Sequence, residues 1–138
     1  MTYFFVDYEN VHLQGLEGIE VLCKYDKVVV YCRKDDIKRI KAYLHNKNIR
    51  ASVEGFVVKE TIKNAADFKL ISDMFHRKRR GIICIISNDK GFDVATNYAM
   101  SQGIVCIRRP KISEAKIKLD DLILIGEENE RINLLLNN

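Results

Sequence analysis

Two aspartates close apolar stretches of the chain, and a third follows one helical turn later. Asp7 ends the run Tyr3-Phe4-Phe5-Val6, and Asp89 comes just after the apolar run that ends at Ile86. Asp93 lies four residues beyond Asp89, so both carboxylates can occupy one face of a helix. Carboxylates held close together repel, and hard oxygen ligands suit Mg²⁺ or Mn²⁺, which would neutralise them. The pattern predicts a divalent-metal site at the ends of strands.

Asp67 is a fourth candidate for this chemistry, and it has an ordinary alternative role. It lies three residues after Asn64, near the start of a predicted helix. A carboxylate in the first turn stabilises the helix dipole, and asparagine is a good N-cap. The same alternative holds for Asp89 and Asp93 at the start of the next helix. It is weaker for Asp7, because a carboxylate that ends a buried strand is costly unless it is paired or bound to a cation.

The elements that must position these acids are short strands and helices in alternation. Apolar, β-branched and aromatic runs predict five buried strands, and three stretches have helical spacing. The strands are predicted at residues 3–7, 27–32, 51–58, 82–87 and 104–107, and the helical spacing covers 37–44, 66–75 and 92–99. Continuous apolar strands favour a parallel sheet. Right-handed crossovers then predict a three-layer α/β/α sandwich whose ligands sit at the carboxyl ends of the strands.

Length and composition indicate one domain. The chain has 138 residues, of which 47% are hydrophobic and 30% charged, so we expect residues 1–138 to form a single domain. Because it has neither an apolar run of about 20 residues nor an N-terminal cleavage signal, we expect a cytoplasmic protein with no membrane partner. The four cysteines lack a CxxC pair, so neither a zinc site nor a disulfide framework is expected.

The C-terminal region is harder to interpret. Residues 111–118 alternate in charge and fit a loop or a weak helix, residues 119–125 are mostly apolar, and residues 127–136 predict a short closing helix. Pro110 should mark the end of the fifth strand, because proline cannot donate to a strand ladder.

Basic residues gather in two blocks. The net charge of +4 favours binding of polyanions only mildly, so the local distribution of the charges says more than their total. One block is His76-Arg77-Lys78-Arg79-Arg80 and the other is Arg108-Arg109-Pro110-Lys111. The first block has two readings: contact with nucleic-acid phosphates, or cations that complement the dipole at a helix C-terminus. Lys90 stands beside the acids. Arg77, Lys78, Arg79, Arg80 and Lys90 are therefore the candidate nucleic-acid contacts.

Three segments contain the acids in one order along the chain. They are Phe5-Val6-Asp7-Tyr8-Glu9-Asn10-Val11, Asn64-Ala65-Ala66-Asp67-Phe68 and Ile86-Ser87-Asn88-Asp89-Lys90-Gly91-Phe92-Asp93. Together they resemble the PIN-like nucleases, especially their NYN-related bacterial branch, over roughly residues 3–107. The resemblance implies a five-stranded parallel sheet in the order 3-2-1-4-5, which sets the fourth strand beside the first.

The same resemblance implies a metal-dependent ribonuclease that hydrolyses RNA, expected to be single-stranded. Asp7, Asp67, Asp89 and Asp93 would be its catalytic residues and would hold one or two Mg²⁺ or Mn²⁺ ions. RNA is the implied partner. A protein partner, such as an antitoxin or a homodimer mate, stays open.

Residues around the acids receive supporting roles from the resemblance. Asn10 would orient the first aspartate or touch a phosphate, and the Ser87 hydroxyl would bond a metal-ligating carboxylate. Glu9 is left open between a ligand and an exposed neighbour. One departure stands out: many NYN-type sequences have a second aspartate at the position of Gly91, whereas this chain offers Asp93 two residues later.

Other functions of the same kind of fold fit the sequence less well than a nuclease. A noncatalytic RNA-binding or scaffolding module would suit a basic block beside carboxylates, although four acids argue against it. A receiver domain needs an aspartate at the end of strand three, where Val57-Val58-Lys59 stands, and a haloacid-dehalogenase-type phosphatase needs one at Glu9. A dinucleotide-binding domain is disfavoured because no GxGxxG follows the first strand.

Overall fold

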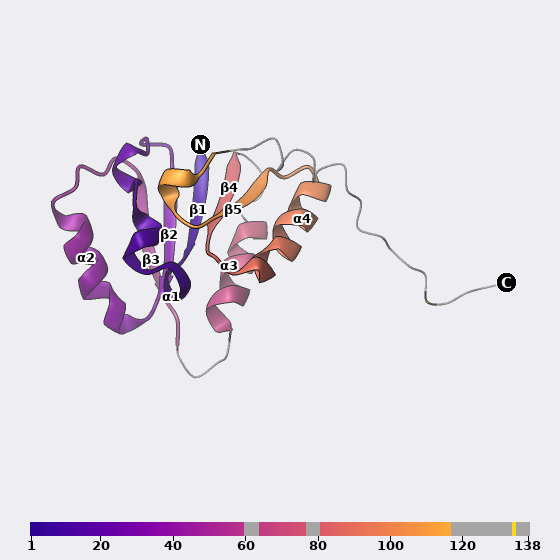
Figure 1. The fold of residues 1–138 in the computed structure, drawn as a ribbon, viewed down its shortest axis with the longest axis horizontal. Coiled ribbons are helices and arrows are strands. Elements are labelled where there is room, and N and C mark those ends of the chain that lie inside the picture. Colours follow the sequence, from indigo (N-terminus) through magenta and orange to yellow (C-terminus); the bar gives the residue numbers. More distant parts are fainter. Residues whose placement is uncertain (60–63, 77–80, 117–133, 135–138) are drawn as a thin grey trace.

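The structure is a computed structural model that describes residues 1–59, 64–76, 81–116 and 134. Its five strands form one parallel sheet in the order β3-β2-β1-β4-β5 (Figure 1). The strands are β1 Thr2–Asp7, β2 Lys27–Cys32, β3 Ser52–Val57, β4 Ile82–Ile86 and β5 Cys106–Arg109. The predicted parallel sheet and its strand order are confirmed.

The fifth strand begins two residues later than predicted, because Ile104 takes part in the C-terminal cap of the preceding helix. The amide of Ile104 donates to the carbonyl of Ala99 at 2.9 Å, and the amide of Gly103 donates to the carbonyl of Met100 at 3.0 Å. With Gly103 at a φ of 81°, this pair of bonds is a Schellman cap. The strand ends at Arg109, two residues later than the predicted range but directly before Pro110, which was expected to mark its end.

Helices occupy the predicted stretches. The α-helices are α1 Tyr8–Val11, α2 Ile37–His45, α3 Ala65–His76 and α4 Asp93–Ser101. Short 3-10 segments are η1 His12–Leu16, η2 Ile19–Val21, η3 Lys34–Asp36, η4 Lys90–Phe92 and η5 Ile112–Glu114. The alternating order implied a helix between β1 and β2, but only the four-residue α1 and two 3-10 segments lie there. Positive φ angles at His12 (53°) and Gly18 (95°) prevent a continuous helix through this connection.

Of the C-terminal region beyond Pro110, the structure describes residues 111–116 and 134. Residues 112–114 form the short 3-10 segment η5. The apolar segment 119–125 and the closing helix predicted over 127–136 lie outside the described residues, apart from Leu134, which is 88% exposed. Within the described residues no helix is long and apolar enough to cross a membrane.

Alternating side chains give the sheet two apolar faces. Phe4 and Val6 of β1 pack on one face with α1, α2 and the 3-10 segments η1, η2 and η5, whereas Phe5 packs on the other with α3, η4 and α4. Figure 1 shows α2 on one side of the sheet and α3 and α4 on the other. The predicted three-layer sandwich is therefore confirmed. By the same alternation Asp7 belongs to the face of Phe5, which is the side that α3 and α4 cover.

The α3 and α4 face should tolerate loss of volume poorly. Ile85 lies in β4 and is fully buried there. We expect Ile85→Ala to lower the free energy of unfolding by about 2–5 kcal/mol, because it leaves a cavity under the helices. The control is Val94→Ala, whose side chain on α4 is 77% exposed and should change stability by less than about 0.5 kcal/mol. Urea unfolding measures both, and equal effects would contradict the described packing.

Candidate active site

The register of the two central strands brings Asp7 and Ser87 together. Val6 of β1 pairs with Ile86 of β4, so the next residue of each strand meets its neighbour at the carboxyl edge of the sheet. Ser87 Oγ donates to Asp7 Oδ2 at 2.9 Å. Both residues are buried, with 6% of Asp7 and none of Ser87 exposed. The hydroxyl thus orients a carboxylate that has little contact with water.

The loop after β4 places Asp89 next to this pair. The amide of Asp89 donates to Ser87 Oγ at 3.0 Å, so one hydroxyl contacts both acidic residues. Asp89 Oδ1 accepts from the amide of Gly91 at 2.8 Å and caps η4, which is the structural role that the sequence had left open. A side chain at Gly91 would bring its Cβ to 3.0 Å from that same oxygen. The absence of a side chain at this position therefore keeps the loop compact.

The face of α3 that packs on the sheet supplies Asp67. Asp67 lies three and seven residues before Leu70 and Met74, which are each only 1% exposed and belong to the core. Residues at this spacing share one side of a helix. The helix α3 starts at Ala65, and its first backbone bond runs from the amide of Phe68 to the carbonyl of Asn64 at 3.1 Å. Asp67 therefore lies in the first turn. Its side of the helix is the one that faces the sheet.

Electrostatic coupling shows that these acids share one neighbourhood. Burial raises the pKa of Asp7 to about 6; the bond from Ser87 opposes this rise, and the negative charges of Asp67, Asp89 and Glu9 add to it. Burial likewise raises the pKa of Asp67, and Asp89 and Glu9 add to the rise. A carboxylate that burial and like charges push toward its neutral form is the situation that a bound cation would reverse.

Oxygen donors of this kind fit Mg²⁺ or Mn²⁺, but they are not arranged as a coordination sphere. Within the described residues no group of three or more His, Cys, Asp or Glu side chains is close enough to hold a metal ion. The donor chemistry and the mutual repulsion of Asp7, Asp67 and Asp89 suit a divalent cation. Asp7, Asp67 and Asp89 thus lie at the same edge of the sheet, but their carboxylates do not surround a common point.

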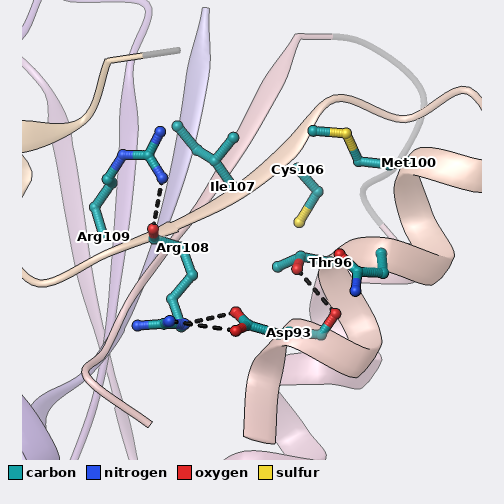
Figure 2. Close-up of a pocket in the computed structure, with 8 residues that line it drawn as sticks. Asp93, Thr96, Met100, Cys106, Ile107, Arg108 and Arg109 are labelled. Atoms are coloured by element: carbon teal, nitrogen blue, oxygen red, sulfur yellow. Dashed lines mark hydrogen bonds and ion pairs between the residues drawn. The ribbon is translucent and has the colours of Figure 1, made fainter. Parts of the chain in front are cut away.

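Asp93, the fourth predicted acid, is directed elsewhere. Its Oδ1 accepts from Arg108 Nε at 2.7 Å and its Oδ2 from Arg108 Nη2 at 3.3 Å (Figure 2). It is not among the charges that raise the pKa values of Asp7 and Asp67. The pair lies beside a cavity of about 300 Å³ between α4 and β5. The expected gathering of Asp93 with the other three acids is therefore not seen.

The supporting residues also have definite contacts. Asn10 Oδ1 accepts from the amide of Asn88 at 2.8 Å, which ties the segment after β1 to the loop after β4. Glu9 is exposed and forms an ion pair with Arg33. Lys90 is exposed in η4, next to Asp89.

Tyr8 follows Asp7 directly but is not available to stack on a base, because its side chain is only 1% exposed and packs in the core. The basic residues Arg77, Lys78, Arg79 and Arg80 lie outside the described residues. The structure adds two arginines, Arg33 and Arg108, that the sequence alone does not place near the acids. Arg108 belongs to a basic block of the sequence, but its pairing with Asp93 depends on the tertiary fold.

One comparison with known proteins identifies a relationship. A family model described as PIN domain matches residues 1–109, which include every strand of the sheet and all three of the coupled aspartates. No curated protein and no solved structure matches the chain significantly.

The raised pKa of Asp7 predicts how stability depends on pH. Because the pKa is about 6 in the folded chain and 3.8 without the fold, ionisation of Asp7 takes away a contribution to stability as pH rises from about 4 through about 6. Asp7→Asn removes that ionisation, and its amide oxygen still accepts from Ser87. We expect the variant to be more stable than the wild type by up to about 3 kcal/mol above pH 6.

Urea unfolding between pH 4 and pH 8 measures this difference. The advantage of Asp7→Asn should shrink as pH falls toward 4. Asp35→Asn, which alters an exposed carboxylate of η3, should follow the wild-type curve. A variant at Asp7 that is less stable than the wild type at pH 7 would contradict the stated burial cost.

Proposed function

Because this chain belongs to the PIN domain family, we propose that it is a metal-dependent ribonuclease that hydrolyses phosphodiester bonds of single-stranded RNA. The observation that carries the proposal is the coupling of Asp7, Asp67 and Asp89 at the carboxyl edge of the sheet. Burial and mutual repulsion raise the pKa values of the first two. An anionic edge of this kind on a parallel sheet is where ligands of such folds bind.

In this proposal Asp7, Asp67 and Asp89 hold Mg²⁺ or Mn²⁺. A divalent cation bound there would supply Lewis-acid chemistry and neutralise charge that develops during phosphodiester hydrolysis. Ser87 orients the carboxylate of Asp7 through its hydroxyl, and Asn10 fixes the loop that carries Asp89 through the amide of Asn88.

Asp93 is left out of the metal-holding set, because Arg108 bonds both of its oxygens. This departs from the role that the resemblance to PIN-like nucleases implied for it. The proposed centre therefore has three carboxylates, with Glu9 as an exposed acid that adds to their negative potential.

The substrate contacts are proposed on charge. Lys90 is exposed beside Asp89, where it can reach a phosphate next to the acids. We assign phosphate contacts also to Arg77, Lys78, Arg79 and Arg80, which are basic residues in sequence. The pattern Asp7-Tyr8-Glu9-Asn10 supports placing the chain in the NYN-related branch of the family.

The compartment is proposed on the cysteines. The described residues include all four cysteines and contain no disulfide, and Cys32, Cys84 and Cys106 are buried. Thiols kept in this form suit a reducing compartment, so we propose a cytoplasmic location.

Cleavage of a labelled single-stranded RNA tests the function. We expect the wild type to cut in Mn²⁺ and in Mg²⁺, and not in EDTA. Asp7→Asn and Asp89→Asn should each lower the rate by at least about 100-fold, because a carboxylate that holds the metal cannot be replaced by an amide. The Asp7 variant should lose activity although it is the more stable protein.

The matched control is Glu20→Gln. Glu20 is exposed in η2 and lines a separate cavity with Lys47, Asn48 and Arg50, so its loss should leave cleavage unchanged. Cutting that persists in EDTA would contradict a metal-dependent reaction. RNA binding without cutting in either metal would favour the noncatalytic module.

A further inference from the structure

Arg108 of β5 forms three bonds that join separate parts of the fold. Its Nε and Nη2 donate to the two oxygens of Asp93 on α4, at 2.7 and 3.3 Å. Its Nη1 donates to the backbone carbonyl of Ser87 at 3.1 Å. The guanidinium thus connects β5, the first turn of α4 and the residue that follows β4. Figure 2 shows Arg108 reaching from β5 toward Asp93.

Ser87, whose carbonyl accepts from Arg108, also contacts Asp7 and Asp89. Ser87 Oγ donates to Asp7 and accepts from the amide of Asp89. Its own amide donates to the carbonyl of Arg109 at 2.9 Å, which continues the pairing of β4 with β5. The bond from Arg108 to the Ser87 carbonyl therefore fixes the peptide between Ser87 and Asn88. This peptide leads directly into Asp89.

Only arginine can make this set of bonds. A planar guanidinium presents its donors as a rigid fork, so one side can bind a carboxylate through two bonds while the remaining nitrogen binds a carbonyl. A lysine would keep the charge but not the three fixed directions. The side chain of Arg108 is 19% exposed and that of Asp93 is 44% exposed. Because the pair is partly solvated, its contribution to overall stability should be small, and variants should fold.

We propose that Arg108 is a positioning residue for the acidic centre, and that Asp93 acts through Arg108 by holding its guanidinium against Ser87. This inference rests on the proposed function. It assigns to Asp93 a role different from that of a metal ligand, and it explains why an acid on α4 is paired with a cation while Asp7, Asp67 and Asp89 repel one another.

Mn²⁺ affinity, measured from the electron paramagnetic resonance signal of free Mn²⁺, tests the assignment. The variants are Arg108→Lys, Asp93→Asn and the double variant. Each single variant should weaken Mn²⁺ binding by about tenfold, as changes behind metal ligands do. The double variant should bind no more weakly than Arg108→Lys, because Asp93 acts only through Arg108. Arg50→Lys, an exposed arginine beside the separate cavity, is the control and should match the wild type.

The opposite pattern would overturn the proposal. If Asp93 is a ligand that Arg108 withholds from the metal, Arg108→Lys will leave Mn²⁺ binding unchanged or tighten it, whereas Asp93→Asn will weaken it. Losses that multiply in the double variant would also show two independent roles. In cleavage assays a positioning role lowers kcat more than it raises KM for RNA.

Amide hydrogen exchange tests, without metal or substrate, whether Arg108 and Asp93 hold the loop that contains Asp89. We expect the amides of Asp89 and Gly91 to exchange several-fold faster in Arg108→Lys and in Asp93→Asn, with the rest of β4 unchanged. Unaltered exchange at these amides would overturn the positioning role. A wild type that neither binds Mn²⁺ nor cuts RNA would reject the proposed function, and the exchange rates would still decide what Arg108 holds in place.

Discussion

The burial of the Asp7 carboxylate at the end of the central strand is the constraint on which the rest of this site depends. A charged group with 6% of its surface exposed loses most of its hydration. The bond from Ser87 offsets part of that cost, and the pKa of Asp7 nevertheless rises to about 6. The fold thus retains an unfavourable charge at the point where its two central strands end.

The surroundings of Asp7 increase this cost instead of relieving it. Asp67 comes from the core-facing side of α3, and Asp89 comes from the loop after β4. Both raise the pKa of Asp7 by their charge. The nearby cations Arg33 and Arg108 are engaged with Glu9 and Asp93. Three acids whose charges add to the burial cost of Asp7 lower the stability of the fold, and this cost is the observation on which the proposed cation site rests.

Two kinds of contact give the acidic edge its shape. Backbone register places Ser87 beside Asp7, since Val6 pairs with Ile86. Polar side chains then tie the loops: Asn10 holds the amide of Asn88, and Ser87 holds that of Asp89. Because the bonds from Ser87 to Asp7 and from Asn88 to Asn10 join the end of β1 to the end of β4, the β1–β4 pairing controls the geometry of the whole edge. The strand order, more than any single loop, is what makes the site.

The sequence by itself determined the strands and the acids that end them. Strand positions follow from local apolar runs, and a charge at the end of such a run is visible without a structure. The sequence did not determine which acids meet. Asp93 has the spacing of a partner for Asp89, yet it pairs with Arg108, because α4 lies against β5. Tyr8 is buried by the packing of α1, and positive φ angles at His12 and Gly18 break the expected first helix. Contacts between distant segments compete for each side chain, and only the tertiary structure decides which of them is made.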